Sequence, residues 1–116
     1  MTEHEALASA QYCYLTTTGR RSGEPREIEI WFALIRRTVY LLAGGGEHAN
    51  WVRNLREDPR AIVQIEDEAF GVRAREPAAG EEGHTARMAL FRKYSTAGRD
   101  LSRWRDQALL VALDFE

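Results

Sequence analysis

Three arginines lie within seven positions of a segment that also carries two glycines and a proline. Arg20, Arg21 and Arg26 belong to this segment, residues 19–26. A guanidinium presents planar donors that match phosphate and carboxylate groups, and glycine lets a ligand approach the main chain closely. The segment is therefore predicted to bind an anion. A solvated hairpin loop is the alternative, because it would have the same composition.

A second glycine-rich segment, residues 44–49 (GGGEHA), stands between an expected strand and an expected helix. Its letters fit the G-x-G-x-x-A pattern that places a dinucleotide pyrophosphate at a helix N-terminus. Glu47 would then put a carboxylate near that pyrophosphate, which is unfavourable. The chain also begins with paired strands rather than alternating strands and helices. We therefore favour a turn that lets a flat ligand lie against the backbone over a dinucleotide site. A plain turn is the alternative.

Two tryptophans and an asparagine stand at places where a ligand could be held. Trp31 shares a strand face with Glu27 and Glu29, so it either packs under a helix or lines a pocket. Trp51 and Asn54 are three residues apart on an expected helix and therefore lie on one side of it. Trp51 is expected in the core. Asn54 at the edge of that apolar face either binds a ligand or caps a loop.

Metal and nucleophile chemistry is not indicated. His4, His48 and His84 are isolated in the sequence, and no H-E-x-x-H or C-x-x-C spacing occurs. The one cysteine, Cys13, has no histidine nearby in the sequence and is expected to be a small buried hydrophobe. No metal site is therefore predicted.

Six strands and two clear helices are expected to position these residues. Alternation and β-branched or aromatic content predict strands at 12–18, 27–35, 38–43, 61–65, 69–75 and 108–115. Helices are predicted at 49–57 and 81–94, with short helical pieces at 3–10 and 100–104. We expect a mainly β fold with helices (α+β), in which a six-stranded antiparallel barrel closes its own edges. The strand–helix–strand order of 38–65 keeps an α/β sheet as the alternative.

The 116 residues limit the class of protein. A chain of this length supports one domain, which we place over residues 1–116. Its 16 basic and 18 acidic side chains give a net charge of −2, and neither half has the basic excess of a nucleic-acid-binding protein. The N-terminus is acidic, and apolar runs such as 108–113 are far shorter than the about 20 residues of a membrane span. We therefore expect a cytoplasmic protein with no nucleic-acid partner and no integral membrane segment.

Two longer motifs resemble those of the deazaflavin-dependent nitroreductase family. Residues 15–26 (LTTTGRRSGEPR) resemble its opening motif, and residues 51–59 (WVRNLREDP) resemble its W-x-x-N-L-x-x-x-P helix, followed by a matching strand at 62–65. The similarity covers about residues 12–76. It implies a split β-barrel that binds coenzyme F-420, a deazaflavin with a phosphodiester and an oligoglutamate tail. It also implies reduction of quinones, nitroaromatics or other activated alkenes.

Taken together with the resemblance, the positions of the candidate residues predict a role for each. The predicted cofactor-binding residues are Arg20, Arg21, Ser22, Gly23, Arg26, Ile30, Ala43, Gly44, Gly45, Trp51 and Asn54. Trp31 and Tyr94 are predicted to act as catalytic residues on the acceptor side, with the Tyr94 hydroxyl reaching an open pocket. A helix-end packing role for Tyr94, with its hydroxyl in water, is the alternative.

The resemblance also implies a small-molecule electron acceptor as the partner. Two other functions stay open, an FMN-binding split-barrel reductase and a non-catalytic protein that carries the deazaflavin. Related split barrels often pair, so a homodimer is a further expectation. The chain departs from the family pattern at Glu29, where the family usually has proline, and cofactor binding therefore transfers better than substrate choice.

Overall fold

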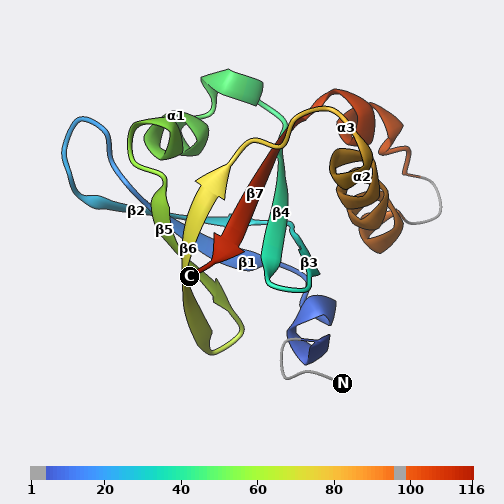
Figure 1. Ribbon diagram of the computed structural model, residues 1–116, viewed down its shortest axis with the longest axis horizontal. Helices are drawn as coiled ribbons and strands as arrows, with labels where there is room; N and C mark the ends of the chain where they lie inside the picture. The colour runs from blue at the N-terminus through green and yellow to red at the C-terminus, as the bar shows by residue number, and fades with distance from the viewer. Residues whose placement is uncertain (1–4, 96–98) are drawn as a thin grey trace.

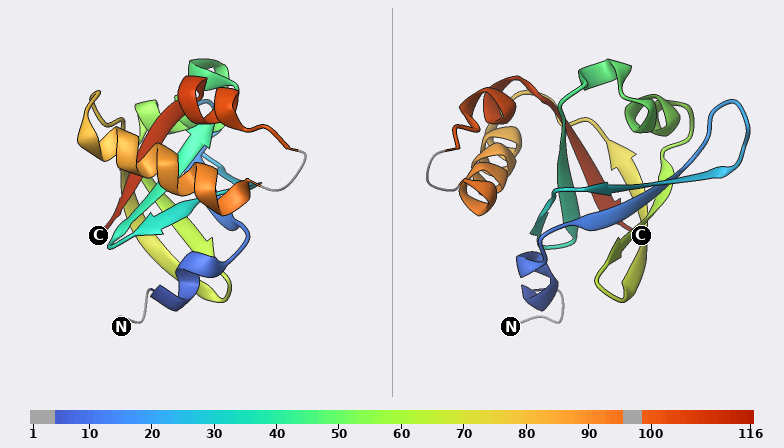
Figure 2. Two further views of the ribbon diagram at one scale, coloured as in Figure 1. Left: turned by 90° about the vertical axis from the view of Figure 1, so that its right-hand side faces the viewer. Right: turned by 180° about the vertical axis from the view of Figure 1, so that it is seen from behind.

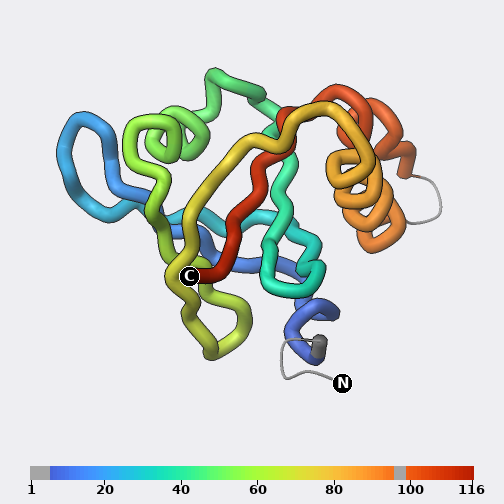
Figure 3. Tube along the Cα trace, in the orientation of Figure 1, coloured from blue at the N-terminus to red at the C-terminus, as the bar shows by residue number. Residues whose placement is uncertain are grey.

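The strands form one curled antiparallel sheet. The computed structural model describes residues 5–95 and 99–116. Its seven strands follow the order β2-β1-β5-β6-β7-β4-β3, and every pair is antiparallel. The strands are β1 (Cys13–Thr18), β2 (Pro25–Ile30), β3 (Ala33–Ile35), β4 (Thr38–Ala43), β5 (Arg60–Ile65), β6 (Glu68–Arg75) and β7 (Leu109–Phe115). Figures 1 and 3 show how the sheet curls, with β1 and β2 passing behind β6, β7 and β4.

The helices lie in two groups on opposite sides of the curled sheet. One group holds the 3-10 turn η2 (Gly46–His48) and α1 (Asn50–Glu57), and the other holds α2 (Glu81–Tyr94) and α3 (Ser102–Gln107). A short 3-10 helix, η1 (Glu5–Ser9), precedes β1. The right view of Figure 2 shows α2 and α3 packed together at one side of the sheet, away from α1. Within the described residues, no helix is long and apolar enough to cross a membrane.

Two hydrophobic clusters use opposite faces of the same strands. In β4, Val39 and Leu41 belong to the cluster inside the curl, whereas Tyr40 and Leu42 belong to a cluster between the sheet and α2. Strand β7 alternates in the same way. Burial on both faces explains why these strands have continuous apolar runs rather than alternation with polar residues. The second cluster fixes α2 and α3 against the outer face of β3, β4 and β7.

The single strand predicted at 27–35 is wrong in one respect, because two strands form there. β2 ends at Ile30 and pairs with β1, whereas β3 begins at Ala33 and pairs with β4. β2 and β3 are the two outermost strands of the sheet order, so Trp31 and Phe32 join its two edges. Seen from behind, β2 runs across the sheet towards β3 and β4 (Figure 2, right). The predicted faces are confirmed, since Phe32 is buried inside the curl and Trp31 packs on the outer cluster.

Candidate active site

A cavity of about 600 Å³ lies between the β1–β2 loop, strand β2 and helix α1. Six predicted cofactor-binding residues line it: Arg20, Arg21, Ser22, Arg26, Trp51 and Asn54. The wall is completed by Thr17, Gly19, Pro25, Glu27, Ile28 and Asn50. Three arginines against one glutamate give this wall a net positive charge. The arrangement suits an anionic ligand with an apolar part, because Trp51 and Ile28 add apolar surface beside the cations.

Asn54 holds the β1–β2 loop against α1. Its side chain is buried, with 4% of its surface exposed. The Asn54 Oδ1 atom accepts hydrogen bonds from the Arg20 main-chain N–H at 3.2 Å and from Arg20 Nη1 at 2.9 Å. Asn54 Nδ2 donates to Thr17 Oγ1 at 3.1 Å, and Arg20 Nη2 donates to Asn50 Oδ1 at 3.3 Å. The loop-capping alternative for Asn54 therefore describes what the structure shows.

Local main-chain bonds shape the loop that carries the arginines. The Gly19 N–H donates to the Glu24 carbonyl and the Gly23 N–H donates to the Gly19 carbonyl, each at 2.8 Å. A side chain at position 19 would begin 2.7 Å from Ser22 Oγ, and Gly23 has a φ of +74°, so both positions favour glycine. Ser22 Oγ accepts a hydrogen bond from Arg26 Nη2 at 3.3 Å, which directs Arg26 back along the loop.

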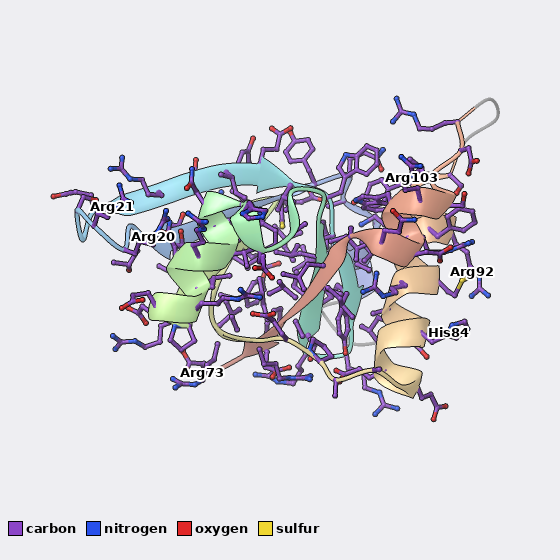
Figure 4. All side chains as sticks on the ribbon, turned by 90° about the horizontal axis from the view of Figure 1, so that it is seen from above. Arg20, Arg21, Arg73, His84, Arg92 and Arg103 are labelled. Carbon is purple, nitrogen blue, oxygen red and sulfur yellow. The ribbon has the colours of Figure 1, made fainter. Side chains whose placement is uncertain are left out.

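Arg20 and Arg21 differ in how far they are restrained. In Figure 4, Arg20 lies beside α1 and Arg21 lies at the tip of the loop. Arg21 is exposed, and within residues 5–95 and 99–116 no ion pair engages Arg20, Arg21 or Arg26. These three positive charges are therefore available to an anion from solution.

A second cavity, of about 260 Å³, lies farther along β2. Its lining residues are Glu29, Ile30, Trp31, Leu42 and Trp104. Ile28 of the first cavity and Ile30 of the second are two positions apart on β2, a spacing of about 7 Å. The positively charged cavity and the aromatic cavity therefore lie in sequence along one strand.

Three aromatic rings meet beside this second cavity. The Trp31 ring stacks on the Tyr94 ring with a centroid distance of 4.2 Å and an interplanar angle of 1°. Trp104 meets Trp31 edge to face at 5.7 Å, and the Arg99 guanidinium carbon lies 5.9 Å from the Trp31 centroid. Trp31 therefore fulfils both predicted alternatives, since it packs under the helices and also lines a pocket. Trp104 is not predicted as a site residue from the sequence, because its short helix has no clear apolar periodicity.

The sequence predicts that the Tyr94 hydroxyl reaches an open pocket, but in the structure this hydroxyl is buried. Tyr94 is 4% exposed, and its Oη lies 2.8 Å from the Gln11 carbonyl oxygen. The Phe32 N–H donates to the same Oη at 3.0 Å. Burial raises the pKa of Tyr94 to about 12. The packing alternative is also inexact, because the hydroxyl binds the main chain rather than water.

Four predicted cofactor-binding residues lie outside both cavities. Ala43 is buried in the core, and Gly44 and Gly45 are exposed in the turn before η2. Gly23 lies in the loop but does not line the first cavity. Cys13 is fully buried, and burial raises the pKa of its thiol to about 12. Within the described part of the chain, no cluster of histidine, cysteine and carboxylate side chains could hold a metal ion.

The sequence matches a protein-family model described as F-420H(2)-dependent quinone reductase over residues 2–114. A conserved hypothetical protein from Mycobacterium tuberculosis superposes with a TM-score of 0.74 at 23% identity, over 100% of this chain and 80% of that chain. An F-420-H2 dependent reductase (FDR-A) superposes with a TM-score of 0.72 at 22% identity, over 90% and 93% of the two chains. The heme storage protein HutZ from Vibrio cholerae superposes at 0.77 with 18% identity, over 98% and 88%.

These likenesses establish a split β-barrel. Their identities are low, so they speak for the fold alone. The expected α+β class is confirmed, with seven strands where six were predicted.

Proposed function

Because the chain belongs to the F-420H(2)-dependent quinone reductase family, we propose that it binds reduced F-420 and passes a hydride to an electron acceptor. The acceptor is a quinone, a nitroaromatic or another activated alkene. The observation that carries the proposal is the placement of a positively charged cavity and an aromatic cavity in sequence along β2. The anionic tail of the cofactor needs the first kind of surface, and a flat acceptor beside the cofactor needs the second.

The first cavity has the donors that the cofactor's tail requires. Arg21 and Arg26 supply guanidinium groups for phosphate and carboxylate oxygens, and Arg20 adds a third, restrained by Asn54 and Asn50. Trp51 supplies an aromatic wall on α1. The donor set therefore fits F-420, and these residues would hold its charged part.

Orientation is the contribution that we assign to the protein. When bound, the reduced deazaflavin supplies the hydride, and the cofactor carries that chemistry. Trp31 and Trp104 offer aromatic surface to a flat acceptor in a cavity of about 260 Å³, which has room for one small ring. Holding two reactants at contact distance removes most of the entropy cost of their encounter.

Cofactor binding is tested by titrating the protein into oxidised F-420 and following the cofactor's fluorescence, with FMN as a competitor. We expect F-420 to bind and FMN to compete weakly, because FMN has one phosphate and lacks the longer anionic tail. Preferential binding of FMN would favour the FMN-using reductase instead.

Turnover is tested with reduced F-420 and menadione, by following the reappearance of oxidised cofactor. We expect multiple turnovers. Binding of F-420 without turnover on any quinone or nitroaromatic would make the protein a carrier, a role consistent with the use of this fold by a heme storage protein.

A further inference from the structure

We propose that Lys93 and Tyr94 are positioning residues that fix Trp31 on the acceptor side of the site. The inference rests on the proposed function for the meaning of "acceptor side". It starts from the joint between the two edges of the sheet. Trp31 and Phe32 form that joint, because β2 ends at Ile30 and β3 begins at Ala33.

The joint leaves main-chain polar groups without partners in the sheet. Trp31 and Phe32 take no part in the ladders that β2 makes with β1 and β3 makes with β4. Phe32 is fully buried, so its N–H and C=O cannot turn to water. Buried main-chain groups of this kind require other hydrogen-bond partners. Both partners come from the last turn of α2.

Tyr94 and Lys93 share the two polar groups of Phe32 between them. The Phe32 N–H donates to Tyr94 Oη at 3.0 Å, and Lys93 Nζ donates to the Phe32 carbonyl at 3.0 Å. Tyr94 Oη lies 2.8 Å from the Gln11 carbonyl and 3.1 Å from that of Phe32. A hydroxyl has one proton to donate, and the shorter distance assigns it to Gln11. Lys93 is then the donor that satisfies the Phe32 carbonyl.

The ammonium group of Lys93 is held in a partly buried place beside two aromatic rings. It is half-buried, and its ammonium nitrogen lies 3.7 Å from the Phe32 ring centroid and 5.3 Å from the Tyr94 centroid. Burial lowers the pKa of this side chain to about 8. Burying an ammonium group is costly without compensation. Here the Phe32 carbonyl and the two rings provide that compensation.

Trp31 is held from two directions by this arrangement. The Tyr94 ring stacks flat on the indole, while the Tyr94 hydroxyl and Lys93 fix the main chain one residue further on. The indole also lines the cavity with Trp104. Small displacements of a group that holds a substrate lower the reaction rate. Lys93 and Tyr94 therefore set the geometry of acceptor binding without touching the acceptor. The Tyr94 hydroxyl donates to Gln11, so it is not placed to donate a proton to the acceptor.

Fluorine NMR of cofactor-free protein labelled with fluorotryptophan tests the positioning directly. The chain has three tryptophans, and Trp31→Phe identifies the Trp31 signal. We expect Lys93→Met and Tyr94→Phe each to shift or broaden the Trp31 signal and to leave the Trp51 signal in place. Arg92→Met, at an exposed cation beside Lys93 on α2, is the matched control and should move neither.

Steady-state kinetics with reduced F-420 and menadione then test the acceptor role. We expect Lys93→Met and Tyr94→Phe to raise the acceptor KM about fivefold, the size of one net hydrogen bond, with F-420 affinity changed less than about twofold. A proton donor would behave differently, because Tyr94→Phe would lower kcat and leave the acceptor KM and the Trp31 signal unchanged. That result would overturn the proposal.

The two readouts separate this proposal from the proposed function. An unmoved Trp31 signal in both variants overturns the positioning role, whatever the kinetics. If Lys93→Met does not fold, Tyr94→Phe decides alone, because it keeps the stacked ring and removes only the hydroxyl. A wild type without turnover on any acceptor would overturn the proposed function and the acceptor role of Trp31. The fluorine signals would still decide whether Lys93 and Tyr94 hold that indole in place.

Discussion

Neighbouring arginines in the β1–β2 loop have different surroundings. Arg20 is tied to α1 through Asn54 and Asn50, so its guanidinium is already oriented before a ligand arrives. Arg21 lies exposed at the tip (Figure 4), where its charge is surrounded by solvent. An oriented donor contributes geometry, whereas an exposed charge contributes an attraction that salt screens. The two residues are therefore expected to respond differently to ionic strength.

We predict that Arg21→Ala weakens F-420 binding more at low salt than at high salt. The loss should be up to about fivefold at low salt, the range for one exposed ion pair, and should fade near 1 M salt. Fluorescence titrations at several salt concentrations measure it. Arg73→Ala is the control, because Arg73 is an exposed cation on β6 that lines neither cavity. Equal affinity of the wild type and Arg21→Ala at every salt concentration would remove Arg21 from the site.

At the scale of elements, the first cavity depends on Asn54, whose side chain joins β1, the β1–β2 loop and α1. We predict that Asn54→Ala costs about 1–3 kcal/mol of stability, because it leaves the Arg20 N–H and Thr17 Oγ1 without their buried partner. F-420 affinity should fall as well, since Arg20 loses its restraint. Denaturant unfolding and fluorescence titration measure the two effects.

Asn54→Asp is the matched variant for the hydrogen bonds that Asn54 makes to the loop and to β1. It keeps an acceptor for Arg20 and removes the donor to Thr17. We expect F-420 affinity closer to the wild type than in Asn54→Ala. If both variants bound the cofactor as the wild type does, the hydrogen bonds of Asn54 would contribute to stability alone.

The glycine turn between β4 and η2 gives a cleaner test of where the flat ring lies. Gly45 has an ordinary φ of −80°, and a Cβ there would meet Ala49 Cβ at 3.6 Å, a normal contact. Gly45→Val should therefore fold. Gly45 lines neither cavity, and we propose that the ring extends beyond them to lie against this turn. On that proposal Gly45→Val loses F-420 affinity by about tenfold or more, because its side chain would displace the ring. Gly71→Ala, in an open position on β6, is the control. Normal binding by Gly45→Val would make the turn a connector only.

Period and composition were enough to predict most elements but not the joint at Trp31 and Phe32. Alternation continues unbroken from Glu27 to Ile35, and the two faces are as predicted. What the pattern could not show is that the segment pairs with one sheet edge before the joint and with the other edge after it. Strand pairing is a long-range property, and local alternation carries no information about it.

The residues of the candidate site also fall into those that the sequence predicts and those that it does not. The arginine loop, Trp51 and Asn54 meet in one cavity although Arg20 and Asn54 are 34 positions apart in the chain. Their resemblance to two motifs of one family, and not local periodicity, predicted that they share a site. The sequence does not predict the surroundings of the Tyr94 hydroxyl or of Trp104, because these come from contacts between elements far apart in the chain. Lys93 was not singled out either, and the one signal for it was that it is the chain's only lysine among sixteen basic residues.

At the scale of the whole molecule, one arginine ties the second helix layer to the sheet. Arg75 on β6 donates to Glu82 of α2 at 2.6 and 2.9 Å and to Asp114 of β7 at 2.6 and 3.2 Å. Tyr40 Oη donates to Glu82 at 2.6 Å, and Thr38 Oγ1 donates to Asp114 at 2.8 Å. The network joins strands β4, β6 and β7 to the first turn of α2. It thereby holds the layer whose far end carries Lys93 and Tyr94.

The network makes the fold's acid stability depend on Arg75. The hydrogen bonds from Arg75 and Tyr40 lower the pKa of Glu82 to about 2, and the Arg75 guanidinium also holds the pKa of Asp114 below its usual value. Both pKa values are lower in the folded than in the unfolded state. Their contribution to stability is therefore present above about pH 4.5 and is lost as the pH falls towards 2. These side chains are about two-fifths exposed, so solvent screening keeps the contribution small.

We predict that Arg75→Gln lowers the free energy of unfolding by about 1 kcal/mol at pH 7, or roughly 4 °C in Tm. The gap to the wild type should narrow steadily between pH 4.5 and pH 2, because the carboxylates that Arg75 stabilises become protonated in both proteins. Thermal unfolding across that pH range measures the gap. Arg73→Gln, at an exposed cation two positions away on the same strand, should show no comparable change with pH. A gap of constant size down to pH 2 would mean that Arg75 stabilises the fold through packing of its side chain and not through its charge.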